Sequence, residues 1–85
     1  MKEIWILGIH ITDRLKEVDT FQAILTKFGC TIKTRLGLHE AREDYCAQSG
    51  LVILELTGST EEFVKLEQEL MKVEGLEVRK MVFGE

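Results

Sequence analysis

The sequence lacks several features that mark common protein classes. It contains no proline, no low-complexity run and no block of like charges, so no segment resembles a disordered region. It has two cysteines, and its N-terminus lacks the small-residue cleavage site of a secretory signal. These two features favour the reducing cytoplasm, where we expect this protein to be located.

Basic residues are also in deficit. The 85 residues include 11 Lys and Arg against 15 Asp and Glu, for a net charge of −4, and the basic side chains are scattered. Proteins that bind nucleic acids through phosphate usually carry a basic stripe. No apolar run approaches the roughly 20 residues of a membrane span. The composition predicts one globular domain, with no direct binding to nucleic acid and no insertion into a membrane.

Recognisable catalytic motifs are absent as well. The sequence contains no Gly-x-Ser-x-Gly, no glycine-rich phosphate loop and no serine with a plausible base. We therefore predict a protein that is not an enzyme.

Hydrophobic periodicity divides the chain into six segments. Residues 30–40 alternate between apolar and polar, residues 3–11 are apolar on both faces, and residues 76–83 alternate less cleanly. Along the predicted helices, apolar residues recur at three- and four-residue steps. The predicted order is strand 3–11, a helix within 12–29, strand 30–40, strand 50–58, a helix within 59–75 and strand 76–83. Right-handed crossovers on this order give an α+β, ferredoxin-like fold. Its antiparallel sheet has strand order 4-1-3-2, with both helices on one face.

Terminal residues predict where the helices begin and end. Asp13 is the expected N-cap of the first helix, and Gly29 stands where a left-handed residue would end it. Ser59 and Glu62 form a capping-box pattern, and Gly75 ends the second helix. The expected buried stripes are Leu15, Val18, Phe21, Ile24, Leu25 and Phe28, and then Phe63, Leu66, Leu70 and Val73.

The sheet face away from the helices is predicted to be apolar. Ile4 and Ile6 on the first strand, with Leu51 and Ile53 on the third, would form a patch that rarely remains exposed in a monomer. We expect these four residues to form the interface of a homo-oligomer. On the second strand, alternation places Cys30, Ile32, Thr34, Leu36 and Leu38 on one face and Thr31, Lys33, Arg35, Gly37 and His39 on the other.

Both histidines and one cysteine are predicted to gather at one end of the sheet. Strands one and two run parallel in this fold, so His10, His39 and the following Cys46 would lie near one another. Two imidazoles and a thiolate suit a transition metal such as zinc, copper or nickel. No pair has a local ligand spacing, however, so half-buried polar residues and a small packed thiol are the alternative.

Four further residues are candidates for binding a small ligand: Asp13, Arg14, Arg35 and Tyr45. The start of a helix after residues 13 and 14 is a natural anion site, although a capping Asp13 would fill it. Tyr45 belongs to a mixed-charge connection and could pack over the sheet end or over a ligand.

Particular stretches give the chain a family resemblance. They are Arg35–Leu38 (RLGL), followed by a charged connection and the apolar strand GLVILEL, and Val73–Phe83 (VEGLEVRKMVF). With the order of elements, these stretches resemble ACT-like domains, and within them the small stand-alone iron-only hydrogenase system regulators. The resemblance implies an oligomeric regulatory module that binds a small ligand or a partner protein. A metal sensor or carrier that uses His39 and Cys46 is the alternative.

Overall fold

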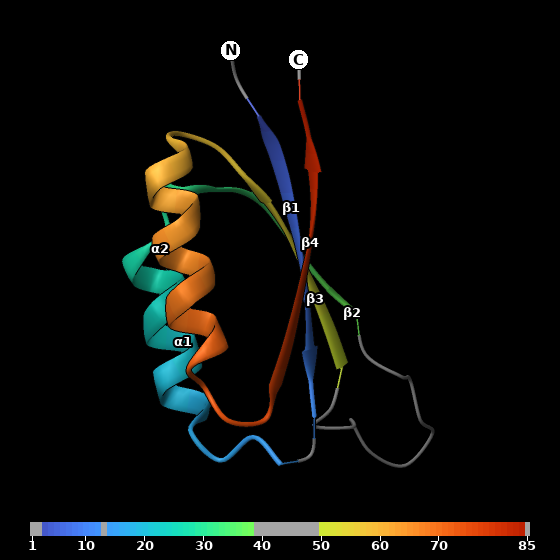
Figure 1. Cartoon of the computed structure of the whole chain (residues 1–85). Coiled ribbons are helices and arrows are strands. Elements are labelled where there is room, and N and C mark those ends of the chain that lie inside the picture. The colour runs from blue at the N-terminus through green and yellow to red at the C-terminus, as the bar shows by residue number, and fades with distance from the viewer. Residues whose placement is uncertain (1–2, 13, 39–49, 85) are drawn as a thin grey trace.

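The computed structural model describes residues 3–12, 14–38 and 50–84. The elements follow the order β1 (Ile4–Ile11), α1 (Val18–Lys27), β2 (Ile32–Leu38), β3 (Gly50–Leu56), α2 (Thr60–Met71) and β4 (Leu76–Phe83). The four strands form one antiparallel-paired sheet in the order β2-β3-β1-β4. Both helices lie on the same side of this sheet (Figure 1). The predicted ferredoxin-like α+β fold and its strand order are confirmed.

The core lies between the sheet and the two helices. The inner side of β1 contributes Trp5, Leu7 and Ile9, which are buried, and the apolar stripe of α2 packs against them. The rings of Trp5 and Phe63 lie with centroids 5.5 Å apart. The predicted stripe of the second helix is confirmed, since all four of its members are buried: Phe63, Leu66, Leu70 and Val73.

The first helix begins later than the sequence predicts. It starts at Val18 with Glu17 as its N-cap, and the Glu17 side chain makes no capping hydrogen bond. Asp13, the predicted cap, lies outside the described residues, but a helix that begins at Val18 excludes that capping role. Val18 itself is exposed instead of joining the stripe, whereas Phe21, Ile24, Leu25 and Phe28 are buried.

A tertiary contact explains the late start. The backbone N–H and the hydroxyl of Thr12 both donate to the carbonyl of Gly75, at 2.9 and 2.8 Å. Gly75 has φ = +94°, and a Cβ on it would lie 2.5 Å from the backbone of Leu15. The chain after β1 therefore packs against Gly75, beyond the end of α2, before it turns into α1. This contact requires a non-helical path, and so α1 begins only at Val18.

Of the predicted helix ends, the Ser59 cap is confirmed, since its side chain accepts from the Glu62 backbone N–H at 3.3 Å. The second helix ends at Met71, four residues before the predicted Gly75, which has a positive φ and lies in the turn that leads into β4. The Glu62 carboxylate lies 3.8 Å from the Lys65 ammonium. Of the two contacts of a capping box, the structure therefore shows the one that the Ser59 side chain makes. Gly29 does not have a positive φ, and the prediction of a left-handed residue there is wrong.

Strand β2 changes its facing partway along. A register shift lies between Ile32, which pairs with the buried Leu56, and Thr34, which pairs with Glu55. A bulge of this kind adds one residue and reverses the alternation after it. Leu36 therefore shares the uncovered face with Ile53, while Arg35 extends to Gln22 of α1, with Nη2 donating at 3.4 Å. The predicted grouping of Ile32 with Leu36, and of Lys33 with Arg35, is wrong.

Candidate functional site: the uncovered sheet face

Within residues 3–12, 14–38 and 50–84, one face of the sheet has no helix over it, as the edge-on view in Figure 1 shows. Strand pairing identifies the residues on this face, because directly paired residues point to the same side. We call it the open face and define it by its described residues: Ile4, Ile6, Gly8 and His10 of β1, Leu51, Ile53 and Glu55 of β3, Thr34 and Leu36 of β2, and Glu77, Arg79, Met81 and Phe83 of β4.

Apolar side chains dominate the open face. The four residues predicted from the sequence lie there: Ile4 and Leu51 are 42% and 45% exposed, and Ile6 and Ile53 are half-buried. The structure adds three exposed apolar residues that the sequence analysis missed, namely Leu36, Met81 and Phe83. Met81 and Phe83 lie on a strand whose alternation is broken at Lys80, and the position of Leu36 depends on the bulge, so no local pattern indicated these three residues.

Charged groups occupy two separate parts of the same face. Near β2, Glu55 accepts from the Thr34 hydroxyl at 3.1 Å and lies 3.6 Å from the Lys33 ammonium. Near β4, the Glu77 carboxylate accepts from the His10 imidazole, with Nδ1 and Oε1 2.6 Å apart. This hydrogen bond, then the charge of His10 and the more distant Arg79 and Arg14, lowers the pKa of Glu77 below its usual value of 4.5.

Of the three predicted metal ligands, only His10 lies among the described residues. His10 lies on the open face near the end of β1, at the level of Leu51, whose other neighbour in register is Leu38 at the end of β2. The first and second strands therefore do end together, as predicted. His39 and Cys46 lie outside the described residues, so the transition-metal hypothesis stays a prediction. Among residues 3–12, 14–38 and 50–84, no group of three or more metal-ligating side chains comes together.

The ligand-binding candidates have separate surroundings. Arg14 is exposed and borders a small pocket of about 170 Å³, which it shares with Lys16, Glu17 and Glu74. Arg35 extends instead to α1 through Gln22. Asp13 and Tyr45 lie outside the described residues. The two arginines thus have different partners, and their proposed ligand-binding roles stay predictions.

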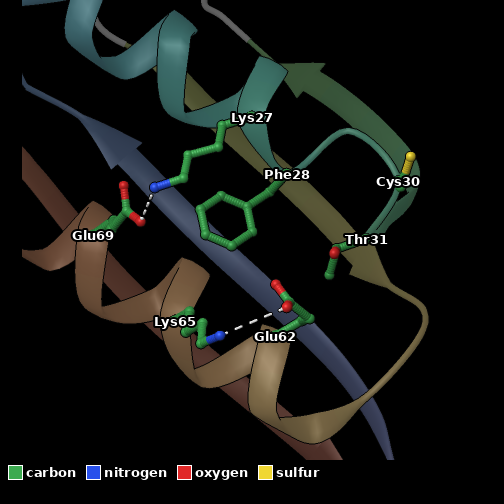
Figure 2. A pocket seen from close by; sticks show the side chains of 7 residues that line it. All are labelled: Lys27, Phe28, Cys30, Thr31, Glu62, Lys65 and Glu69. Atoms are coloured by element: carbon green, nitrogen blue, oxygen red, sulfur yellow. Dashed lines mark hydrogen bonds and ion pairs between the residues drawn. The ribbon is translucent and has the colours of Figure 1, made fainter.

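A larger pocket of about 490 Å³ lies beside the helices, near the end of α1 (Figure 2). Its charges pair with one another: Lys27 Nζ lies 2.8 Å from Glu69 and Lys65 Nζ lies 3.8 Å from Glu62. Figure 2 shows the sulfur of Cys30 at the rim, away from both ion pairs. Because the lysines already have carboxylate partners, this pocket offers little free charge to an anionic ligand.

Comparison with known proteins gives structural likenesses. No protein-family model matches the chain, and no curated protein sequence matches it. The uncharacterized protein TM1266 of Thermotoga maritima superposes with a TM-score of 0.78 at 23% identity, over 98% of this chain and 100% of that one. The PII-like nitrogen regulatory protein CPII of Thiomonas intermedia K12, bound to ADP, AMP and bicarbonate, gives a TM-score of 0.50 at 17% identity, over 99% and 96%.

A third likeness is to part of an enzyme. A formyltetrahydrofolate deformylase from Pseudomonas putida KT2440 gives a TM-score of 0.53 at 13% identity, with 92% of this chain covering 28% of that one. All three identities are low, so the likenesses establish the ferredoxin-like fold. The narrower resemblance to iron-only hydrogenase system regulators stays a prediction.

Proposed function

We propose that this chain is a non-enzymatic regulatory or binding module that works as a homo-oligomer, with the open face as its contact surface. The assembled oligomer would bind a small ligand or a partner protein. The observation that carries the proposal is the open face itself, where seven apolar side chains lie beside one another and neither α1 nor α2 covers them: Ile4, Ile6, Leu36, Leu51, Ile53, Met81 and Phe83.

The physical argument is the cost of leaving this surface in water. Scattered exposed aliphatic residues are ordinary, but contiguous apolar patches of several hundred Å² mark interaction surfaces. Burying apolar area contributes roughly 25 cal/mol per Å². The likeness of fold to CPII, whose structure holds nucleotides and bicarbonate, supports the regulatory part of the proposal.

Changing one exposed apolar residue of the open face to a charged one tests the proposal. We expect the unmodified chain to have at least the mass of a dimer at micromolar concentration in size-exclusion chromatography with light scattering. Leu51→Glu should raise the dissociation constant about thirtyfold or more, the effect of losing an interface hot spot. Leu36→Glu should act in the same way, because it too places a carboxylate in the apolar contact.

Met71 provides the matched control. It is 64% exposed on α2, on the helix side of the molecule, so Met71→Glu adds the same charge away from the open face. We expect Met71→Glu to keep the mass of the unmodified protein. A monomeric unmodified chain at tens of micromolar, or an oligomer that survives both Leu51→Glu and Leu36→Glu, would contradict the proposal.

A further inference from the structure

Strand register arranges the open face as a grid of rows that cross the sheet. One row holds Thr34, Glu55, Ile6 and Met81, the next holds Leu36, Ile53, Gly8 and Arg79, and the third holds Leu51, His10 and Glu77. Ile4 and Phe83 extend the β1–β4 side by one more row beyond Ile6 and Met81. Neighbouring strands lie about 4.8 Å apart and successive rows about 6.8 Å apart.

The apolar residues follow one diagonal of this grid. They begin at Ile4 and Phe83, pass through Ile6 and Ile53, and end at Leu51 and Leu36. The two remaining corners carry the charges. Glu55, with Thr34 and Lys33, occupies the corner beside β2, and Arg79 with Glu77 occupies the corner on β4.

Four simple two-fold axes in the plane of the face can be compared. An axis parallel to the strands would set Arg79 over the partner's Leu36, and one across the strands would set Phe83 over the partner's Glu77. An axis along the charged diagonal would set Arg79 over its own copy. An axis along the apolar diagonal sets the apolar stripe on itself and exchanges the two charged corners, which brings Arg79 over the partner's Glu55 and Thr34.

We propose that a second copy of this chain covers the open face about a two-fold axis along the apolar diagonal, and that Arg79 of each copy pairs with the partner's Glu55. The inference rests on the proposed function, because it specifies how the proposed oligomer is built. It makes two identical ion pairs per dimer, as the symmetry of an isologous interface requires.

Once a second copy covers the open face, the charge of Arg79 requires a carboxylate beside it. Its guanidinium donates to the neighbouring Val78 carbonyl at 3.0 Å, and within the described part of the chain no acidic side chain lies at ion-pair distance from it. A buried unpaired charge strongly destabilises a complex. Glu55 of the same chain lies two strands and one row away, with Cα atoms about 12 Å apart by sheet geometry.

The partner's Glu55 fits this need, since its carboxylate is already held in place by Thr34 and Lys33. Lys33 repels the incoming guanidinium, and Glu77 beside Arg79 partly offsets that repulsion. Gly8 lacks a side chain, so it leaves a hollow on β1 beside the apolar stripe, which allows the two stripes to approach closely.

Charge exchange tests this arrangement directly. Glu55→Arg alone sets arginine against the partner's Arg79, and Arg79→Glu alone sets carboxylate against carboxylate. Each variant should weaken dimerisation about tenfold or more, the scale of close interfacial charge pairs. An equimolar mixture of the two should form a heterodimer about as tight as the unmodified dimer, since both contacts become opposite in charge again. Native mass spectrometry distinguishes the heterodimer by subunit mass, and circular dichroism verifies that each single variant is folded.

The outcomes separate the two proposals. If the mixture forms no heterodimer, or if the single variants dimerise as tightly as the unmodified chain, the Arg79–Glu55 pairing is overturned. The proposed oligomeric function would still stand in that case, provided that Leu51→Glu dissociates the assembly. A monomeric unmodified chain would overturn both. The double variant Glu55→Arg/Arg79→Glu should dimerise on its own, and failure to do so in a folded protein also counts against the pairing.

Discussion

Single residues decide the geometry where the chain folds back on itself. Gly75 combines a positive φ with a close approach to Leu15, and its carbonyl accepts two hydrogen bonds from Thr12. Gly58 also has a positive φ, of 115°, but nothing lies within 4 Å of where its Cβ would be. A side chain at either glycine would strain the backbone, but only at Gly75 would it also clash with a neighbour. Comparing substitutions at the two positions therefore separates the cost of strain from the cost of the clash.

We expect Gly75→Ala to be the more damaging of these two substitutions. Gly58→Ala should lower the free energy of unfolding by about 1 kcal/mol, because only backbone strain opposes it. Gly75→Ala should cost that amount plus the displacement of the backbone at Leu15, and so about 3 kcal/mol or more. Urea denaturation of both variants measures the difference. Equal losses at the two sites would show that the crossing adjusts freely to a methyl group.

At the scale of the element, hydrophobic periodicity predicts a segment well when the segment buries its apolar side chains against its neighbours. The second helix begins at a side-chain cap, and all four residues of its stripe are buried. The last strand alternates poorly because Lys80 pairs with Leu7 on the covered side. Its ammonium lies 4.4 Å from the centre of the Trp5 ring and 3.1 Å from Glu67, so a charged residue occupies a position where an apolar one is expected.

The cap of α2 gives a prediction for one element. Ser59→Ala removes the side-chain acceptor for the Glu62 N–H and should lower the free energy of unfolding by about 1 kcal/mol. Ser59→Asp keeps an acceptor at the helix N-terminus and should retain most of the stability. Thermal denaturation of the two variants compares them. If Ser59→Asp proved as unstable as Ser59→Ala, the cap would not be the source of the effect.

On the scale of the whole molecule, both helices lie on one side of the sheet, so no helix of the described residues covers the other side. No helix among the described residues is long and apolar enough to cross a membrane. The open face would bury its apolar diagonal against a second copy, which couples folding to assembly through mass action.

This coupling predicts a concentration-dependent melting temperature. If the folded chain dimerises and the unfolded chain does not, Tm should rise with protein concentration across a hundredfold range. Leu51→Glu should remove most of this dependence, because the folded monomer then has no partner. Differential scanning calorimetry over that range makes the measurement. A Tm of the unmodified chain that is constant with concentration would argue against dimerisation linked to folding.

Hydrophobic periodicity was enough to predict the order of elements, the fold and four of the open-face residues. Periodicity and helix ends are local signals, and they were sufficient at Ile4, Ile6, Leu51 and Ile53. They failed for Asp13 as the cap of α1, for Val18, for Gly29 and for the facing of β2.

Tertiary structure decided these features because their causes lie elsewhere in the chain. The start of α1 depends on Thr12 meeting Gly75, which is 63 residues away. The facing of Leu36 and Arg35 depends on a bulge against β3, which alternation within β2 does not reveal. The diagonal of apolar residues, with Glu55 and Arg79 at opposite corners, exists only after four strands are in register, because each strand alone carries just one column of it.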